Sequence, residues 1–266
     1  MRIIDCSADS HLDCAVTRAA RDQALPVAAE HGLEVFVNER PAMKITCTPQ
    51  HLAEMVLGRL LTEGFIRRPE EIEEIYICEK GLRAKVLLCA QAAAALTARQ
   101  TETVGTCCTD NRTLLAGEER GLAPVTPIVW QPDWIRGAAA YLQAHQPLYA
   151  DTHALHACCL AREGHPLCCR EDLGRHNALD KAVGWALETG EDLSRCLLYT
   201  TGRMPADMVS KAIRAGVPLL ASKTYPTDQG IALARQAGLT LVTLRRDGGL
   251  LVWNDGNMTE RNENND

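Results

Sequence analysis

Residues 197–221 read LLYTTGRMPADMVSKAIRAGVPLLA and contain the pattern that decides the fold. The short apolar run at 197–200 predicts a strand, and Pro205 then begins a helix that ends at Gly216. A second apolar run, 217–221, predicts the next strand. This strand–helix–strand order is typical of an α/β fold whose sheet is at least partly parallel.

The alternation continues on both sides of this unit. On its C-terminal side we expect a helix at 228–237 that ends at Gly238, followed by strands at 239–244 and 250–253. On its N-terminal side a helix opens at Asn177 and runs to Gly190. The second half of the chain therefore predicts a regular α/β domain.

The first half is less regular. Apolar and polar residues alternate over 33–39 and 43–47, which predicts two paired strands. Thr48 is then expected to cap a helix that ends near Gly64, with Pro49 at its first position. Strands at 71–78 and 85–89 and a helix at 133–145 follow, and Pro147 marks the expected domain boundary.

These elements predict an α/β protein of two domains. Residues 1–28 form a loosely held lead-in, and 29–147 form a small N-terminal α+β domain that carries a cysteine loop. Residues 148–255 form the larger C-terminal α/β domain, and the charged segment 256–266 is expected to be disordered.

Composition and charge exclude two classes of partner. The 266 residues carry a net charge of −6 and the sequence pI is near 5.8, whereas a nucleic-acid binder normally shows a basic face and a high pI. No run of about 18 apolar residues is present, and the first residues lack the apolar core of a secretory signal. We expect a cytoplasmic protein with no nucleic-acid and no membrane partner.

Twelve cysteines are present, and six of them form adjacent pairs: Cys107-Cys108, Cys158-Cys159 and Cys168-Cys169. In a chain of this length without a secretory signal, reduced thiols are expected. A disulfide between sequence neighbours is strained, so the pairs are not structural cross-links.

Cys107 and Cys108 lie in a polar segment, 101–112, that predicts a loop. An accessible thiolate there would be a nucleophile that another protein can reach, with Arg112 near enough in sequence to help. The alternative is that both are merely small loop residues.

The segment Arg170–Lys181 is the densest in charge. One interpretation is a capped helix, with Asn177 as N-cap and Asp180 at the third helical position. That interpretation leaves unexplained why Asp172, Arg175 and His176 crowd the turn before the helix, so the segment is also a candidate site.

Two turns are candidates for binding an anion. Arg203 lies where a strand meets a helix N-terminus, whose free N–H groups favour negative charge. The second turn contains two arginines, and in isolation it is equally a hairpin tip: Leu244, Arg245, Arg246, Asp247, Gly248 and Gly249.

A zinc site is the remaining alternative. His153, His156, Cys158 and Cys159 are close in sequence, but a zinc deaminase needs His-x-Glu followed by Pro-Cys-x-x-Cys. Leu155 stands in place of the glutamate and the cysteine spacing differs. We therefore expect no metal ligands.

Together these segments resemble the formate dehydrogenase accessory sulfurtransferase family (FdhD). The block Arg170–Lys181 is similar to the most diagnostic stretch of that family almost residue for residue. Other segments match in order and spacing: Thr48-Pro49, 60–66, Thr152–Ala154, Thr201–Arg203 and 244–249. The similarity covers about 35–255.

The resemblance implies a cytidine-deaminase-like fold for the C-terminal domain and a homodimer. It implies a sulfurtransferase that takes persulfide sulfur from a cysteine desulfurase and passes it to molybdenum bis(guanine dinucleotide) cofactor, before that cofactor enters the formate dehydrogenase apoenzyme. Cys107 or Cys108 would carry the persulfide, and the 244–249 turn, Arg203, Asp172, Arg175 and His176 would bind the cofactor.

One departure from the family concerns the cysteine loop. The family usually has Cys-Gly-x-Cys-Gly, whereas this chain has Gly105-Thr106-Cys107-Cys108-Thr109. A chaperone that holds the cofactor without transferring sulfur is therefore a second hypothesis, and a zinc hydrolase or deaminase is a third.

Overall fold

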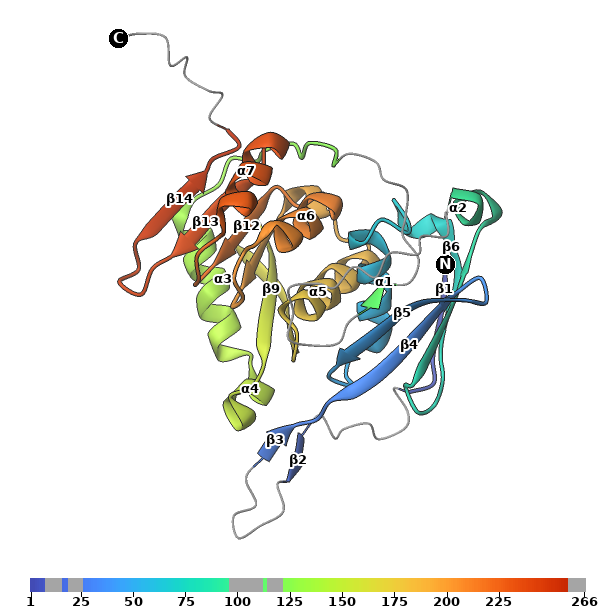
Figure 1. Ribbon diagram of the computed structural model, residues 1–266. Coiled ribbons are helices and arrows are strands. Elements are labelled where there is room, and N and C mark those ends of the chain that lie inside the picture. The colour runs from blue at the N-terminus through green and yellow to red at the C-terminus, as the bar shows by residue number, and fades with distance from the viewer. Residues whose placement is uncertain (8–15, 19–25, 96–111, 114–121, 258–266) are drawn as a thin grey trace.

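The structure is a computed structural model that describes residues 1–7, 16–18, 26–95, 112–113 and 122–257. Within these ranges it contains two six-stranded sheets with helices between and beside them (Figure 1). A short pair of strands, β2 (Val16–Arg18) and β3 (Pro26–Ala28), stands apart from both. None of the helices in these ranges is long and apolar enough to cross a membrane.

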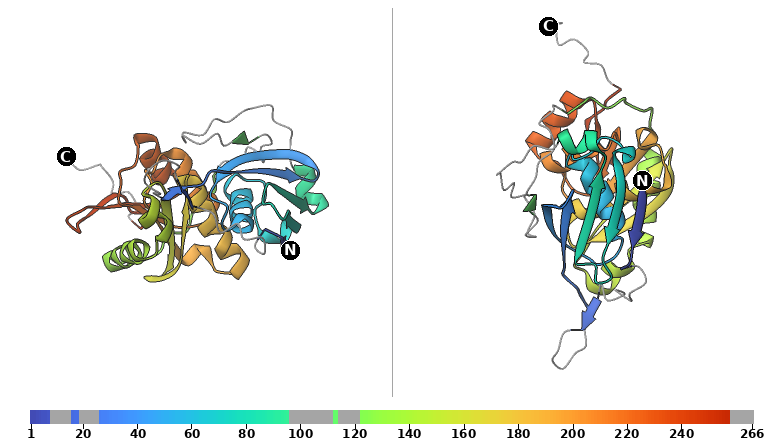
Figure 2. Two further views of the ribbon diagram at one scale, coloured as in Figure 1. Left: turned by 90° about the horizontal axis from the view of Figure 1, so that it is seen from below. Right: turned by 90° about the vertical axis from the view of Figure 1, so that its right-hand side faces the viewer.

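The first sheet has the order β1-β6-β7-β4-β5-β8. Its pairs β1/β6 and β4/β7 are parallel, and the others are antiparallel. Its inner face packs toward helix α1 (Leu52–Thr62), while its outer face, turned toward the viewer on the right of Figure 2, carries the more exposed side chains. The strands are β1 (Arg2–Asp5), β4 (His31–Val37), β5 (Arg40–Cys47), β6 (Ile72–Ile77), β7 (Arg83–Leu88) and β8 (Arg112–Thr113).

The second sheet has the order β10-β9-β11-β12-β13-β14, with β11, β12 and β13 parallel to one another. Strand β9 runs antiparallel to both of its neighbours, so β10 has the direction of β11. The strands are β9 (His156–Arg162), β10 (His165–Asp172), β11 (Cys196–Thr200), β12 (Leu219–Ser222), β13 (Thr240–Leu244) and β14 (Leu250–Asn254).

Helices cover both faces of the second sheet. One face packs on α5 (Arg175–Thr189), α6 (Ala206–Arg214) and α7 (Asp228–Ala237), and the other packs on α3 (Pro132–Ala144). Helix α3 precedes the expected domain boundary at Pro147, yet its apolar residues belong to the core of the second sheet. Two short helices, α2 (Ala90–Ala95) and α4 (Pro147–Thr152), complete the set in the described ranges.

Helices α1 and α5 lie side by side between the two sheets (Figure 1). Two glycines let their backbones approach closely: a Cβ at Gly58 would lie 1.9 Å from the carbonyl oxygen of Asp180, and a Cβ at Gly184 would lie 1.7 Å from that of Glu54. One continuous apolar cluster includes residues of both sheets and of these helices. The two sheets are thereby packed into one core.

Adjacent cysteines are explained by strand geometry. Successive side chains of a strand point to opposite faces. Cys158 lies in the core on the α5 side of β9, and Cys159 lies in the core under α3. Cys168 and Cys169 alternate in the same way on β10.

Three expectations from the sequence are wrong. Residues 2–5 are not a loose lead-in, because β1 pairs in parallel with β6. Thr48 does not cap α1, which begins at Leu52 after His51 in a left-handed conformation. Asn177 does not cap α5 either, because that helix already begins at Arg175 with Gly174 at its N-cap.

Candidate functional site

The candidate site lies along one edge of the second sheet. Strands β10, β11, β12 and β13 all end there, and β9 and β14 begin there. In open sheets with parallel strands, ligands bind outside the carboxyl ends of the strands. Helices α5, α6 and α7 begin directly after β10, β11 and β12, so three helix N-termini also meet this edge.

The turn after β13 and the segment after β12 form a pocket of about 430 Å³ at this edge. Three of its lining residues are basic and one is acidic: Lys223, Tyr225, Arg245, Arg246 and Asp247. All five side chains are exposed. Lys223 lies between β12 and α7, and Arg245 and Arg246 lie in the hairpin turn between β13 and β14. Such a group of cations is suited to phosphate groups.

The turn that carries the two arginines is well ordered by its own contacts. Arg245 N donates to the carbonyl of Gly249 at 2.8 Å, and Asp247 accepts from Gly249 N at 3.0 Å. Gly248 has φ near 80°, a conformation that side chains rarely adopt. Asp247 is also paired with Arg245, and the amide of Gly249 together with that guanidinium holds the pKa of Asp247 below its usual value.

The turn after β11 places Arg203 beside this pocket. Met204 forms a bridge with Pro226, and its amide donates to the carbonyl of Tyr225. Gly202 packs on the stem of Arg175, since a Cβ there would lie 2.7 Å from the Arg175 Cβ. The turn is therefore fixed between α5 and the Tyr225 segment, with the Arg203 side chain exposed.

Asp172 is at the same edge but faces inward. Its carboxylate is fully buried and pairs with Lys181 at 2.6 Å. One oxygen accepts from the amide and hydroxyl of Thr48, and the other accepts from Gly174 N and Asn177 Nδ2. With these partners Asp172 fixes the turn that leads into α5 and joins it to the end of β5.

His176 and Arg175 occupy the first turn of α5 and are almost fully buried. His176 Nε2 lies 2.9 Å from an Asp207 oxygen in the first turn of α6. The pair therefore joins the N-termini of two helices that meet the edge. Arg175 and His176 therefore lie at the edge that the pocket occupies, but they do not belong to the residues that line it.

Asp180 belongs to a buried polar network between α1, α5 and α6. Its carboxylate accepts from Lys211 at 3.0 and 3.1 Å and from Thr62 at 2.7 Å. Arg59 donates to Asn177 at 3.1 Å and lies 3.6 Å from Asp180. These two polar residues of α5 thus hold helices together rather than cap one.

Sequence reasoning missed three residues at this edge, Tyr149, Lys223 and Tyr225, and it considered His156 only as a zinc ligand. The Lys223 ammonium lies 6.0 Å from the centre of the Tyr149 ring. Glu171 holds α4, and with it Tyr149, by accepting from the amides of Leu148 and Tyr149. Lys223 and Tyr225 could have been found from the sequence, because they follow a predicted strand directly. Arg203 and Arg245 were selected as candidates for the same reason.

Burial suppresses the reactivity of several cysteines. It raises the pKa of Cys168, Cys169 and Cys196 to about 12, and it raises the pKa of Cys47, Cys158 and Cys159 even further. These thiols are therefore protonated at neutral pH, whereas sulfur chemistry requires a thiolate. Cys107 and Cys108 lie outside the described residues.

The proposed zinc ligands do not converge. His156 Nδ1 bonds to Thr201, and Cys158 and Cys159 lie on opposite faces of β9. Among the described residues no group of three or more His, Cys, Asp or Glu side chains is arranged to hold a metal ion.

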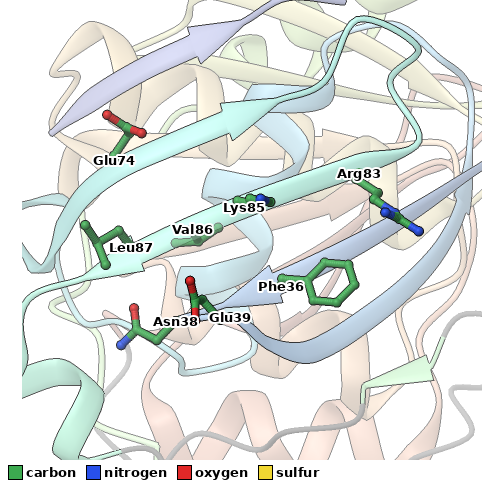
Figure 3. A pocket seen from close by; sticks show the side chains of 8 residues that line it. All are labelled: Phe36, Asn38, Glu39, Glu74, Arg83, Lys85, Val86 and Leu87. Carbon is green, nitrogen blue, oxygen red and sulfur yellow. The ribbon is translucent and has the colours of Figure 1, made fainter.

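A second pocket, of about 400 Å³, lies on the outer face of the first sheet (Figure 3). Phe36, Leu87 and Lys85 project into it from β4 and β7. Two of its four charged lining residues, Glu74 and Arg83, are paired with Arg2 and Glu34, respectively. None of its lining residues belongs to the edge described above.

The chain is similar to several known proteins. It is 32% identical over 262 residues to "Sulfur carrier protein FdhD" of Cupriavidus necator, covering 94% of this chain and 90% of that one. It is 30% identical over 245 residues to the protein of the same name in Mycobacterium tuberculosis, covering 85% and 89%.

A solved structure shares the fold. A formate dehydrogenase accessory protein from Desulfotalea psychrophila matches with a TM-score of 0.70 and 29% identity, over 90% of this chain and 95% of that one. The model of the FdhD/NarQ family matches residues 28–259. The chain therefore belongs to the FdhD/NarQ family.

Proposed function

We propose that this protein carries sulfur during the maturation of formate dehydrogenase. It accepts persulfide sulfur from a cysteine desulfurase and transfers it to the molybdenum of the bis(guanine dinucleotide) cofactor before the apoenzyme receives that cofactor. Family membership and the names of the relatives support the sulfur-carrier role. The donor, the cofactor, a cytoplasmic location and a homodimer are our extension of it.

The observation that carries the proposal is the basic pocket at the carboxyl edge of the second sheet. Lys223, Arg245 and Arg246 surround a volume that suits a nucleotide, and three helix N-termini point to the same edge. Tyr225 offers an aromatic face, which is a surface on which a base can stack. A guanine dinucleotide has both the phosphates and the bases that such a pocket accepts.

The sulfur chemistry requires a thiolate outside the core. The thiolate of Cys107 or Cys108 attacks the outer sulfur of the desulfurase persulfide; a new S–S bond forms on the carrier, and the donor S–S bond breaks to release the desulfurase thiolate. Both cysteines lie in a polar segment, whereas burial keeps the thiols of Cys158, Cys159 and Cys168 protonated. This contrast excludes the buried cysteines, and the resemblance to the family points to Cys107 or Cys108 as the persulfide carrier.

The test replaces both cysteines with alanine in cells that lack the endogenous carrier. We expect formate dehydrogenase activity to be lost, while the melting temperature of the purified variant stays unchanged. Cys158→Ala is the matched control and should retain maturation activity if it remains folded. Full activity in the Cys107→Ala/Cys108→Ala variant would refute sulfur transfer through this loop.

The second candidate function is cofactor holding without sulfur transfer. The pocket favours it, because none of the described residues that line it is a cysteine. This alternative predicts that the double cysteine variant supports full maturation and still binds a guanine nucleotide.

A further inference from the structure

His156 lies at the edge of the second sheet where the candidate site is located. It is the first residue of β9, opposite Asp172 of β10 in the strand register, and it neighbours the turn after β11. Its side chain is half-buried.

A hydrogen bond with Thr201 orients the ring of His156. The Thr201 hydroxyl oxygen accepts from Ala157 N at 3.0 Å and lies 3.3 Å from His156 Nδ1. A hydroxyl can donate its own hydrogen while its oxygen accepts from an amide, so Thr201 can donate to Nδ1. In the tautomer whose Nδ1 accepts from Thr201, the neutral imidazole carries its proton on Nε2, for which the described residues provide no hydrogen-bond partner.

The charges that face the ring come from three directions. Arg175 and His176 approach from α5, Lys223 approaches from the segment after β12, and the buried Asp172 lies on β10. Burial, and then the two cations, lower the pKa of His156 below its usual value, so the ring is neutral at pH 7. A neutral ring avoids repulsion from Arg175 and Lys223 when the site is empty.

We propose that His156 is a ligand-binding residue of this site, whose Nε2–H donates a hydrogen bond to a phosphate oxygen of the bound dinucleotide. The inference rests on the proposed function for the identity of the ligand. Two consequences follow. First, the Nε2–H donor is present in both the neutral and the cationic ring. Second, a bound anion favours the cationic ring, so ligand binding raises the pKa of His156, and the affinity increases as the pH falls.

The test measures the affinity of the full chain for diguanosine 5′,5′-pyrophosphate. Its phosphates are diesters, so its charge stays constant over the pH range of histidine titration. We expect His156→Ala to weaken binding roughly tenfold at neutral pH, as for a lost hydrogen bond to a charged group. His156→Gln places an amide N–H near the position of Nε2 and should recover most of this loss.

The pH profile separates a ligand contact from a structural role. From about pH 8 to about pH 5.5 the affinity of the wild-type protein should rise, and that of His156→Gln should rise less. His176 is present in both proteins, so the comparison isolates the contribution of His156. In parallel, NMR of the imidazole should show a higher pKa for His156 with saturating ligand than without it.

His153→Ala is the matched control. This exposed histidine packs edge-on against Tyr149, and its loss should leave the affinity unchanged. If His156→Ala binds as tightly as the wild-type protein and the His156 pKa does not respond to ligand, the inference is overturned and the proposed function stands. If the wild-type protein does not bind the dinucleotide at all, both are overturned.

Discussion

At the residue scale, the site is held in place by buried charged residues whose partners are far away in the sequence. Lys181 has no exposed surface, and it donates to the Thr48 hydroxyl at 2.7 Å in addition to pairing with Asp172. The pair connects the end of β5 in the first sheet with the turn before α5 in the second. Its role is therefore structural, although its sequence motif resembles a site.

Removing the cation should leave a buried carboxylate without its counter-charge. We expect Lys181→Met to lower the free energy of unfolding by about 3–5 kcal/mol, as is typical when one partner of a buried pair is lost. Lys44→Met, which removes an exposed pair with Glu34, should cost less than about 1 kcal/mol. Urea unfolding of both variants checks this, and equal stabilities would contradict the structural role.

Acid stability should depend on Glu63. Burial alone would raise its pKa, but the attraction of Lys211 at 2.8 Å and of Arg59 lowers it to about 2. A carboxylate with a depressed pKa stabilises the fold above about pH 4.5, and this contribution is lost as the pH falls through about 2.

The variant that tests this is Glu63→Gln, with the exposed Glu73→Gln as control. Thermal melts from about pH 5 to about pH 2.5 should show a shallower loss of stability for Glu63→Gln than for the wild-type protein. Glu73→Gln should follow the wild-type curve. Parallel curves for Glu63→Gln and the wild-type protein would rule out this contribution.

The predictions for Thr48 and Asn177 were wrong for the same physical reason. Thr48 and Asn177 are favourable N-cap residues, so the sequence predicted caps. In the structure Thr48 bonds to Asp172, 124 positions away, and Asn177 bonds to the carbonyl of Thr46, 131 positions away. Partners at such separations leave no periodic signal in the sequence.

At the element scale, segments that carry their own start and stop signals were predicted well. The helix expected at 228–237 is α7, with the Thr227 side chain capping its start and Gly238 in the left-handed conformation at its end. The alternating strands at 33–39 and 43–47 are β4 and β5. By contrast, β1 is only four residues long, and it pairs with β6, which is far away in the sequence. The local sequence therefore could not predict it.

The close contact of α1 and α5 gives a prediction at this scale. A methyl group at Gly184 would overlap the backbone of Glu54, which cannot move independently of α1. We expect Gly184→Ala to destabilise the protein by about 3 kcal/mol. Gly137→Ala is the control, because its new Cβ in α3 would meet nothing nearer than 3.8 Å, and loss of helical glycine stabilises by about 0.5–1 kcal/mol.

Calorimetric melts of the two alanine variants decide the point. The melting temperature should fall for Gly184→Ala and rise slightly for Gly137→Ala. An unchanged melting temperature for Gly184→Ala would show that the helices can separate without cost, contrary to the packing described here.

At the scale of the whole molecule, the topology brings together residues that are far apart in the sequence. Arg203, Lys223 and Arg245 follow three successive strands of one sheet, so a basic edge arises from β11, β12 and β13. The sequence singled out Arg203 and Arg245 from their turns. It could not show that Lys223 and His156 join them, because strand order is a property of the fold.

The measurement that tests the central claim most directly is the mapping of persulfide sulfur on the chain. The protein is incubated with a cysteine desulfurase and cysteine and then digested, and the masses of its peptides are measured by mass spectrometry. We predict one added sulfur atom on the peptide that contains Cys107 and Cys108, and none on peptides that contain Cys158, Cys168 or Cys196. Sulfur on these buried cysteines, or none on the loop peptide, would contradict the account.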